Sequence, residues 1–235
     1  MKLRLDKYLA DMGLGSRANV KKLVRAGEIY VNGWRVRTPD TKVDPQVDVV
    51  ERNHERIEYV TFEYWMLNKP AGVVSATRDD GSETVVDLLR GAHRKDLFPV
   101  GRLDKDTVGL LLITNDGQLA HKLLTPGKHV SKVYFARLEH SATKEDIQAF
   151  AQGIDIGDSA PTLPAQLEIL DPAHANEVHV TLHEGRYHQV KRMFEARGNK
   201  VEYLKRIAMG TLVLDPALGE GESRPLTEQE LECLL

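Results

Sequence analysis

The sequence predicts an α+β protein with a small basic N-terminal domain and a larger domain, in which helices flank a mixed, mostly antiparallel sheet. Two observations support this. The chain has 235 residues, enough for two modest domains with their own cores. Residues 1–37 carry nine Lys or Arg and three acids, a net charge of +6, so the remainder carries −9 of the overall −3. We therefore expect a basic module at 1–58 and an acidic body at 59–235.

Two short helices are predicted in the basic module. Leu3–Met12 forms the first, and Ser16 is a good N-cap for a second that ends near Gly27. At about 100° per residue, the second helix separates an apolar side from a basic outer face. The cations of that outer face are Arg17, Lys21, Lys22 and Arg25. Such a face either grips phosphates or is simply solvated.

A β-hairpin follows the helices. Glu28–Val31 and Trp34–Thr38 are strand-like segments joined by Asn32-Gly33, the strongest short hairpin signal. Arg35 lies in its second strand, where it could grip a phosphate. The segment Glu51–Glu58 is charged and has no apolar period, so we predict that it is the linker between the domains.

The larger domain alternates between strand-like and helix-like segments. Pro70 and Gly72 predict a reversal after the first strand, and Lys69 beside it either meets a phosphate or is merely exposed. The predicted strands are Tyr64–Leu67, Val73–Thr77, Val108–Ile113, Lys132–Leu138, Ala165–Leu170 and Val178–Leu182. The predicted helices are Thr84–Arg90, Gln118–Leu124 up to the Thr125-Pro126-Gly127 break, Thr143–Ala151, and Tyr187–Arg197 closed by Gly198.

The stretch Gly101–Gly117, GRLDKDTVGLLLITNDG, organises this domain. Val108–Ile113 is a short apolar run ended by the turn signal Asn-Asp-Gly, so it reads as a central strand buried on both faces. Asp104 precedes it in a loop at the rim of rigid structure, where catalytic groups often lie. The alternative is that Asp104 caps a turn or pairs with Arg102.

A second basic segment lies inside the acidic body. Residues 183–206 carry seven Lys or Arg and three acids. On the predicted helix, Val190, Met193 and Phe194 form a buried side, and His188, Lys191 and Arg192 project from the opposite side as neighbours. These cations either face a carboxylate in a cleft or form a solvated surface.

Several functional classes are disfavoured. Histidines 179, 183 and 188 fit no familiar metal site, and the sequence contains no GxGxxG or P-loop motif for a nucleotide cofactor. The single Cys233 fits a reducing compartment. No apolar run approaches the roughly 18 to 20 residues of a membrane span, and Met1–Ala10 is too charged for a signal peptide. We expect a cytoplasmic protein without metal, cofactor or membrane partner.

Several motifs resemble known families. RLDKYLADMGLGSR and VRAGEIYVNG, within residues 1–50, resemble the S4 domain, an RNA-binding module. KPAG at 69–72, GRLDKDTVGLLLITNDG at 101–117, KVY at 132–134 and EGRYHQVKRMF at 184–194 resemble, in order, the motifs of the RsuA family of pseudouridine synthases.

The resemblance implies isomerisation of a uridine in ribosomal RNA by a monomer that needs no cofactor. Asp104 matches the family's essential nucleophile, which attacks either the sugar C1′ or the base. Tyr134 matches the tyrosine that packs against the flipped base, and Lys191 matches the cation that keeps the carboxylate ionised. Arg192 either shares that role or contacts a phosphate. The side chains expected to contact RNA are Arg4, Arg17, Lys21, Lys22, Arg25, Arg35, Lys69, Arg102, Arg186 and His188.

Among relatives, the chain looks most like the enzyme that modifies a single uridine, uridine 516 of 16S ribosomal RNA. A uridine of 23S ribosomal RNA is the rival within the family. A non-catalytic RNA-binding or ribosome-assembly factor is the rival outside it. A hydrolase that uses Asp104 and Asp106 as a carboxylate pair is disfavoured, because residues two apart on an extended segment point to opposite sides.

Overall fold

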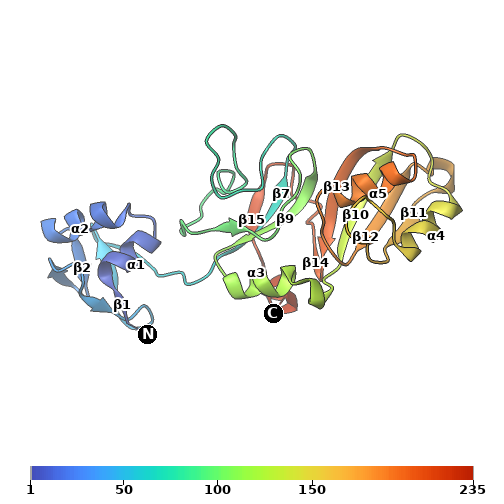
Figure 1. Cartoon of the computed structure of the whole chain (residues 1–235). Coiled ribbons are helices and arrows are strands. Elements are labelled where there is room, and N and C mark those ends of the chain that lie inside the picture. Colours follow the sequence, from blue (N-terminus) through green and yellow to red (C-terminus); the bar gives the residue numbers. More distant parts are fainter. Residues whose placement is uncertain (1, 235) are drawn as a thin grey trace. The chain divides into compact units, whose positions relative to one another are not determined.

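The computed structural model describes residues 2–234 and divides into two compact units. The smaller unit comprises residues 1–63 and 91–97, and the larger comprises residues 64–90 and 98–235. Both are seen in Figure 1. No helix in the described part of the chain is long and apolar enough to cross a bilayer.

The smaller unit packs two helices against short strands. Ser16 accepts a hydrogen bond from the Asn19 backbone N–H, and Gly27 ends the second helix in the left-handed conformation, as predicted. Val20 and Val24 of that helix are fully buried. The elements are β1 (Leu3–Arg4), α1 (Leu5–Asp11), α2 (Arg17–Ala26), β2 (Ile29–Val31), β3 (Trp34–Val36), β4 (Lys42–Val43), β5 (Val50–Arg52) and β6 (Glu55–Arg56).

The prediction of a linker at Glu51–Glu58 was wrong. β5 pairs with β2, and β6 pairs with β5, so this segment completes a four-stranded sheet in the order β3-β2-β5-β6. Asn53 and His54 take positive φ angles and form the turn. The charged side chains lie on the solvent side of a short hairpin, which hides the strand pattern. The chain continues in this unit beyond residue 58, where the Tyr59 ring lies 4.9 Å from the Tyr8 ring.

The larger unit is built on a mixed, mostly antiparallel sheet, as predicted. Its main strand order is β11-β12-β10-β13-β9-β7-β15, and only the β13–β9 pair is parallel among the described strands. The strands are β7 (Tyr64–Lys69), β8 (Phe98–Pro99), β9 (Val108–Thr114), β10 (Lys132–Leu138), β11 (Gln166–Ile169), β12 (Glu177–Leu182), β13 (Val201–Met209), β14 (Leu212–Val213) and β15 (Ser223–Pro225). All seven residues of β9 are buried, which confirms it as a central strand.

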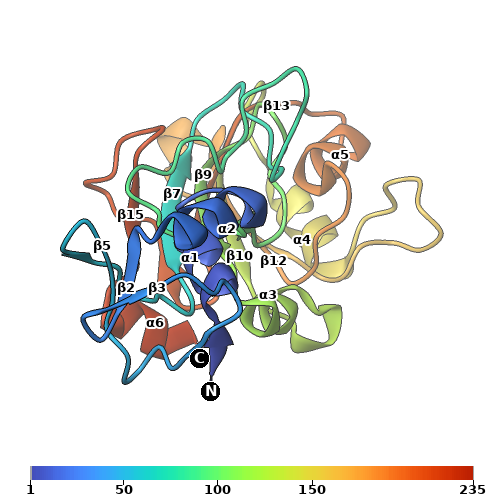
Figure 2. The ribbon, with the colours of Figure 1, turned by 90° about the vertical axis from the view of Figure 1, so that its left-hand side faces the viewer.

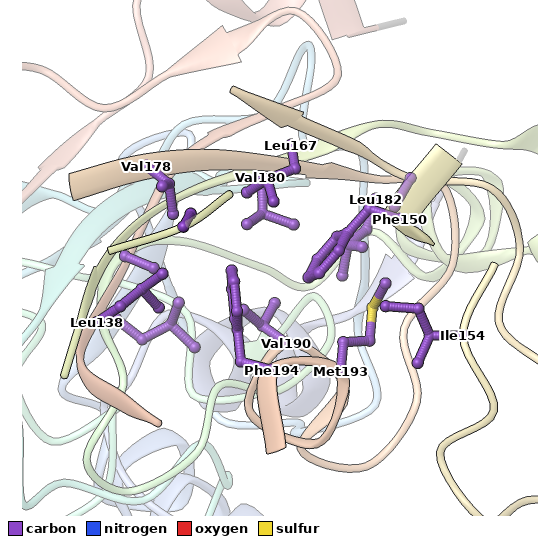
Figure 3. Packing of buried hydrophobic residues seen from close by; sticks show 14 of the residues in the cluster. Leu138, Phe150, Ile154, Leu167, Val178, Val180, Leu182, Val190, Met193 and Phe194 are labelled. Atoms are coloured by element: carbon purple, nitrogen blue, oxygen red, sulfur yellow. The ribbon is translucent and has the colours of Figure 1, made fainter. Parts of the chain in front are cut away.

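In the described residues of this unit, four α-helices flank the sheet, together with two short 3₁₀ turns at Pro126–Lys128 and Pro172–His174. The helices are α3 (Gly117–Leu124), α4 (Lys144–Gln152), α5 (Gln189–Ala196) and α6 (Glu228–Leu234). Figure 3 shows Val190, Met193 and Phe194 of α5 facing Val178 and Val180 of β12 in one core cluster. A second cluster joins α3 and α6 to the sheet through apolar residues that include Leu123 and Leu234. Figure 2 shows these two helices at one end of the unit.

Two predicted elements between β7 and β8 do not form. Residues Val73–Thr77 contribute only an isolated bridge, between Val74 and Thr84. The helix predicted at Thr84–Arg90 is a series of turns instead. The Asp87 carboxylate accepts hydrogen bonds from both the backbone N–H and the hydroxyl of Thr84, which closes a single turn.

Candidate functional site

A cavity of about 580 Å³ lies in the larger unit, a size typical of small-ligand sites. Its walls come from residues 101–105 and 107, the segment 74–76 and residues 185–190, which lead into α5. Residues of β10, β12 and β13 contribute to its base. Among the described lining residues, Asp104 is the only carboxylate.

The backbone of the Asp104 loop is held from beneath by Lys69. This lysine is fully buried at the end of β7. Its Nζ donates hydrogen bonds to the carbonyl oxygens of Pro70 at 3.1 Å, Asp104 at 3.0 Å, Lys105 at 3.3 Å and Thr107 at 2.9 Å. Burial lowers the pKa of Lys69 to about 8. The carbonyl cage ties the loop to the sheet.

A serine holds the preceding residue of the same loop. The Ser75 hydroxyl donates to the Leu103 carbonyl at 2.8 Å and accepts from the Leu103 backbone N–H at 3.0 Å. The Thr107 backbone N–H donates to the Asp104 carbonyl at 3.1 Å, which forms a turn. Asp104 is therefore fixed on both sides by short-range and long-range contacts.

Two side chains from the start of α5 approach the Asp104 carboxylate. His188 Nε2 lies 3.5 Å from its Oδ1, and Lys191 Nζ lies 3.5 Å from its Oδ2. The Asp104 side chain is 26% exposed, so it reaches the cavity without facing bulk water. Lys191 makes a closer contact with Asp106, at 2.6 and 2.8 Å, and this hydrogen bond lowers the pKa of Asp106. One ammonium group thus bridges both carboxylates.

Tyr134 lies at the base of the cavity on β10. It pairs with Val180 of β12 on one side and with Arg206 of β13 on the other. Leu182 and Leu204, both nearly buried, complete an apolar surface around it. Tyr134 is therefore placed on the same cavity as Asp104.

Local hydrogen bonds hold the loop before α5 in place. Gln189 is buried, and its side chain accepts a hydrogen bond from the Arg186 backbone N–H and donates one to Glu184. His188 has a φ of 48°, in the left-handed region that few non-glycine residues adopt. Tyr187, 72% exposed, stacks on the His188 ring with 3.8 Å between centroids. The helix begins at Gln189, two residues later than predicted.

The structure corrects the expectation that Lys69 contacts RNA, and it places Arg192 away from Asp104. Lys69 is enclosed by carbonyl groups and exposes no surface to RNA. Arg192 Nη2 donates to Asp158 at 2.6 Å and is not brought to Asp104. Arg186 lines the cavity, but its guanidinium also donates to Glu184 and to the carbonyl groups of Ala160 and Pro161. Apart from Glu184, these partners lie in other segments of the chain, so a sequence pattern cannot reveal them.

The remaining predicted RNA contacts are solvent-accessible. Arg102 is exposed at the rim of the cavity. On α2, Arg17, Lys22 and Arg25 are exposed, and no carboxylate of residues 2–234 forms an ion pair with them. The others have partners: Arg4 pairs with Asp6 at 2.9 Å, Lys21 lies 4.0 Å from the same carboxylate, and Arg35 donates to the Tyr30 hydroxyl.

Four residues of the site were missed by sequence reasoning. Lys132 and Arg206 line the cavity from β10 and β13, Gln189 braces the loop before α5, and Ser75 braces Leu103. The alternation of β10 around Tyr134 is the one signal that could have placed Lys132 on the same face. The other three depend on contacts between segments distant in sequence.

Two alternatives, hydrolysis by a carboxylate pair and a metal site, can be compared with the positions of the carboxylates and histidines. Asp106 is 74% exposed, pairs with Lys191 and does not line the cavity, so it is separated from Asp104 as a second catalytic carboxylate. In residues 2–234 no group of three or more His, Cys, Asp or Glu is arranged to hold a metal ion.

Comparisons with known proteins identify the same two families that the sequence motifs resemble. Residues 63–196 match the family described as RNA pseudouridylate synthase, and residues 3–49 match the S4 domain. The chain is 49% identical over 234 residues to "Uncharacterized RNA pseudouridine synthase YtzG" of Bacillus subtilis, covering 99% of this chain and 98% of that protein. It is 40% identical over 234 residues to "Ribosomal small subunit pseudouridine synthase A" of Escherichia coli K12, covering 99% and 100%. A solved structure described as "Crystal structure of pseudouridylate synthase" superposes with a TM-score of 0.70 at 40% identity, covering 99% and 100%.

Proposed function

This chain belongs to the family of RNA pseudouridylate synthases, and we propose that it isomerises uridine 516 of 16S ribosomal RNA with Asp104 as the nucleophile. The position of the Asp104 carboxylate carries the catalytic part of the proposal. It lies in a cavity, 3.5 Å from both His188 and Lys191, with Tyr134 at the base. The small-subunit target is supported by full-length relatives that carry that name in several bacteria.

The reaction exchanges one bond for another without a net change in oxidation state. The N1–C1′ bond breaks, and its electron pair stays with the uracil ring. The ring turns, C5 forms the new bond to C1′, the proton of C5 is lost and N1 takes up a proton. Asp104 attacks either C1′ or the base, and both routes need an ionised carboxylate in contact with a nucleotide outside its stack.

The site is suited to a flipped nucleotide. Extruding a uridine costs a few kcal/mol of stacking, and packing of the base against Tyr134 returns about 1 to 3 kcal/mol. Lys191 Nζ and His188 Nε2 each lie 3.5 Å from an oxygen of the Asp104 carboxylate, which places an ammonium group beside the proposed nucleophile. The arrangement therefore supports Asp104, Tyr134 and Lys191 in the roles that their motifs suggest.

The smaller unit is proposed to hold the surrounding RNA. Arg17, Lys22 and Arg25 on α2 are exposed and pair with no described carboxylate, and the β2–β3 hairpin adds Arg35. Phosphates and minor-groove hydroxyls are the accessible groups of folded RNA. We propose that the enzyme acts as a monomer in the cytoplasm on free RNA or on a partly assembled subunit.

The test is to map pseudouridines in ribosomal RNA from cells that lack this protein and from the same cells complemented with it. The expected result is loss of pseudouridine at position 516 of 16S ribosomal RNA and its return with wild-type protein, but not with Asp104→Asn. Loss at a 23S position would mean that the enzyme catalyses the same reaction on 23S ribosomal RNA instead. Return of the modification with Asp104→Asn would overturn the catalytic assignment, and an unchanged map would favour an assembly role.

A further inference from the structure

Two cations at the cavity have no negative partner in the described part of the chain. Arg206 is 2% exposed, its Nε donates to the Leu110 carbonyl at 2.8 Å, and its Nη2 is buried without a hydrogen-bond partner. Lys132 donates to the Val130 carbonyl at 3.1 Å. Within residues 2–234, no carboxylate forms an ion pair with either side chain. A buried donor without a partner is costly, by about 1 to 3 kcal/mol, unless a ligand satisfies it.

A local irregularity in the sheet places these cations beside Tyr134. Val133 of β10 pairs with Ala208, but Tyr134 pairs with Arg206, so the β-bulge skips Ile207. Without the bulge, Ile207 would lie opposite Tyr134 and Arg206 would turn to the other face of the sheet. Lys132 is two residues from Tyr134 and shares its face. Lys132, Tyr134 and Arg206 thus form one surface of the cavity.

The electrostatics of this surface are unusual. Burial lowers the pKa of Lys132, and the neighbouring Arg206 lowers it further. Asp104 enters the cavity from the loop on another wall and is held by His188 and Lys191. The base of the cavity therefore carries positive charge without a compensating carboxylate.

The depth of Lys132 and Arg206 in the cavity identifies the part of the nucleotide that they would contact. A flipped nucleotide enters a pocket base first, and its phosphates remain near the rim. Arg206 is 2% exposed and lies two residues along β13 from the buried Leu204, whereas the exposed Arg102 and Tyr187 mark the rim. A group that reaches Arg206 is therefore part of the base and not a backbone phosphate.

We infer that Lys132 and Arg206 form an anion subsite that stabilises the negative charge on the uracil ring between cleavage of the N1–C1′ bond and formation of the C5–C1′ bond. The inference rests on the proposed entry of a flipped uridine into the Asp104 cavity. The electron pair of the broken bond spreads over N1, O2 and O4. Preorganised donors in a site shielded from water stabilise such developing charge strongly. Neither residue forms or breaks a covalent bond.

The experiment measures single-turnover rates and RNA affinity for Lys132→Gln and Arg206→Gln. The substrate is ribosomal RNA from cells that lack this protein, presented as the free RNA or particle that the wild-type enzyme modifies, so it contains the true target wherever that lies. Lys205→Gln is the matched control, because it removes the same charge from the adjacent residue of β13 on the opposite face of the sheet.

Both cavity variants should lose rate by about 10- to 1,000-fold at saturating RNA, while the RNA Kd stays within about threefold and Lys205→Gln remains near wild type. A second substrate, RNA containing 5-fluorouridine, separates charge stabilisation from structural damage. Fluorine at C5 makes the departing uracil anion a weaker base, so its negative charge needs less stabilisation by Lys132 and Arg206. Consumption of the fluorinated nucleotide, measured by mass spectrometry of nucleosides, should therefore show a smaller defect than consumption of uridine.

Three results would overturn the inference. One is a wild-type rate in both variants, and another is an equal defect on uridine and 5-fluorouridine. The third is a loss confined to RNA Kd with a reduced salt slope, which would indicate a phosphate contact. Lys132 is only partly buried, so Lys132→Gln keeps the test open if Arg206→Gln unfolds, as a thermal melt would show. Activity of Asp104→Asn on uridine would instead refute the role of Asp104 in the proposed function, independently of Lys132 and Arg206.

Discussion

The buried Nζ of Lys69 donates a 3.0 Å hydrogen bond to the backbone carbonyl of Asp104, so the last residue of β7 holds the residue on which the chemistry is proposed to depend. The same ammonium also binds the carbonyls of Lys105 and Thr107. It therefore fixes the backbone of the loop, while His188 and Lys191 approach the carboxylate from α5. The backbone contacts thus come from β7, and the contacts to the carboxylate come from the segment that starts α5.

Replacing Lys69 by Met should destabilise the larger unit by about 2 to 4 kcal/mol, because it leaves buried carbonyl groups without a donor. It should also lower turnover, since the Asp104 loop loses its anchor. Urea denaturation and single-turnover kinetics measure the two effects. The control is Lys105→Met, an exposed neighbour whose loss should change stability little. Equal stabilities for the two variants would contradict the role assigned to the carbonyl cage.

Lys69 also predicts a pH dependence of stability. Burial lowers its pKa from 10.5 to about 8 in the folded chain, so between these pH values the unfolded chain holds a proton that the folded chain has released. The free energy of unfolding should therefore rise with pH across this window, by at most about 3 kcal/mol, and stay flat below it. The measurement is the difference in unfolding free energy between wild type and Lys69→Met from pH 7 to 10.5. A difference that falls or stays constant would show that the folded state keeps Lys69 protonated.

Asp104→Asn should abolish turnover, because the amide is nearly isosteric but is not a nucleophile. RNA affinity should remain within about tenfold, since the recognition surfaces are unchanged. Pseudouridine formation and RNA binding are measured on the same preparation. Full activity of this variant would refute Asp104 as the nucleophile.

Gly109→Ala should destabilise the protein by about 3 kcal/mol or more. Gly109 has a φ of 100°, and a Cβ there would lie 2.3 Å from the Arg206 carbonyl oxygen on the parallel strand β13. The chain would have to separate β9 from β13 to fit it. Thermal unfolding checks this against Gly117→Ala, where the added Cβ meets no atom within 4 Å. A melting temperature like that of wild type would show that the strands separate at little cost.

Neutralising Arg17, Lys22 and Arg25 together with Gln should flatten the salt dependence of RNA binding by about two to three units of slope, because each lost phosphate contact removes roughly 0.7 to 0.9. The measurement is RNA Kd against salt concentration. Removing the exposed charges of Lys144 and Lys200 on the larger unit provides the comparison. An unchanged slope in the α2 variant would mean that this face does not contact RNA.

The sequence predicted elements well where the pattern was local. Ser16 caps α2, Asn32-Gly33 turns the hairpin, and the apolar run at Val108 becomes a fully buried strand. It failed where the segments were short and their partners distant. The hairpin at Val50–Arg56 was mistaken for a linker because charged side chains cover it, and Thr84–Arg90 was mistaken for a helix because its turns satisfy the same local spacing.

By itself, the sequence determined the two-part organisation, the buried β9 strand and the loop that carries Asp104, because charge distribution and periodicity are written along the chain. Tertiary structure alone decided that Lys69 is enclosed by carbonyl groups, that Lys191 bridges Asp104 and Asp106, and that Arg206 lies opposite Tyr134. These outcomes depend on strand register and on the burial of charged groups. Both are set by pairing between distant segments, so no local pattern encodes them.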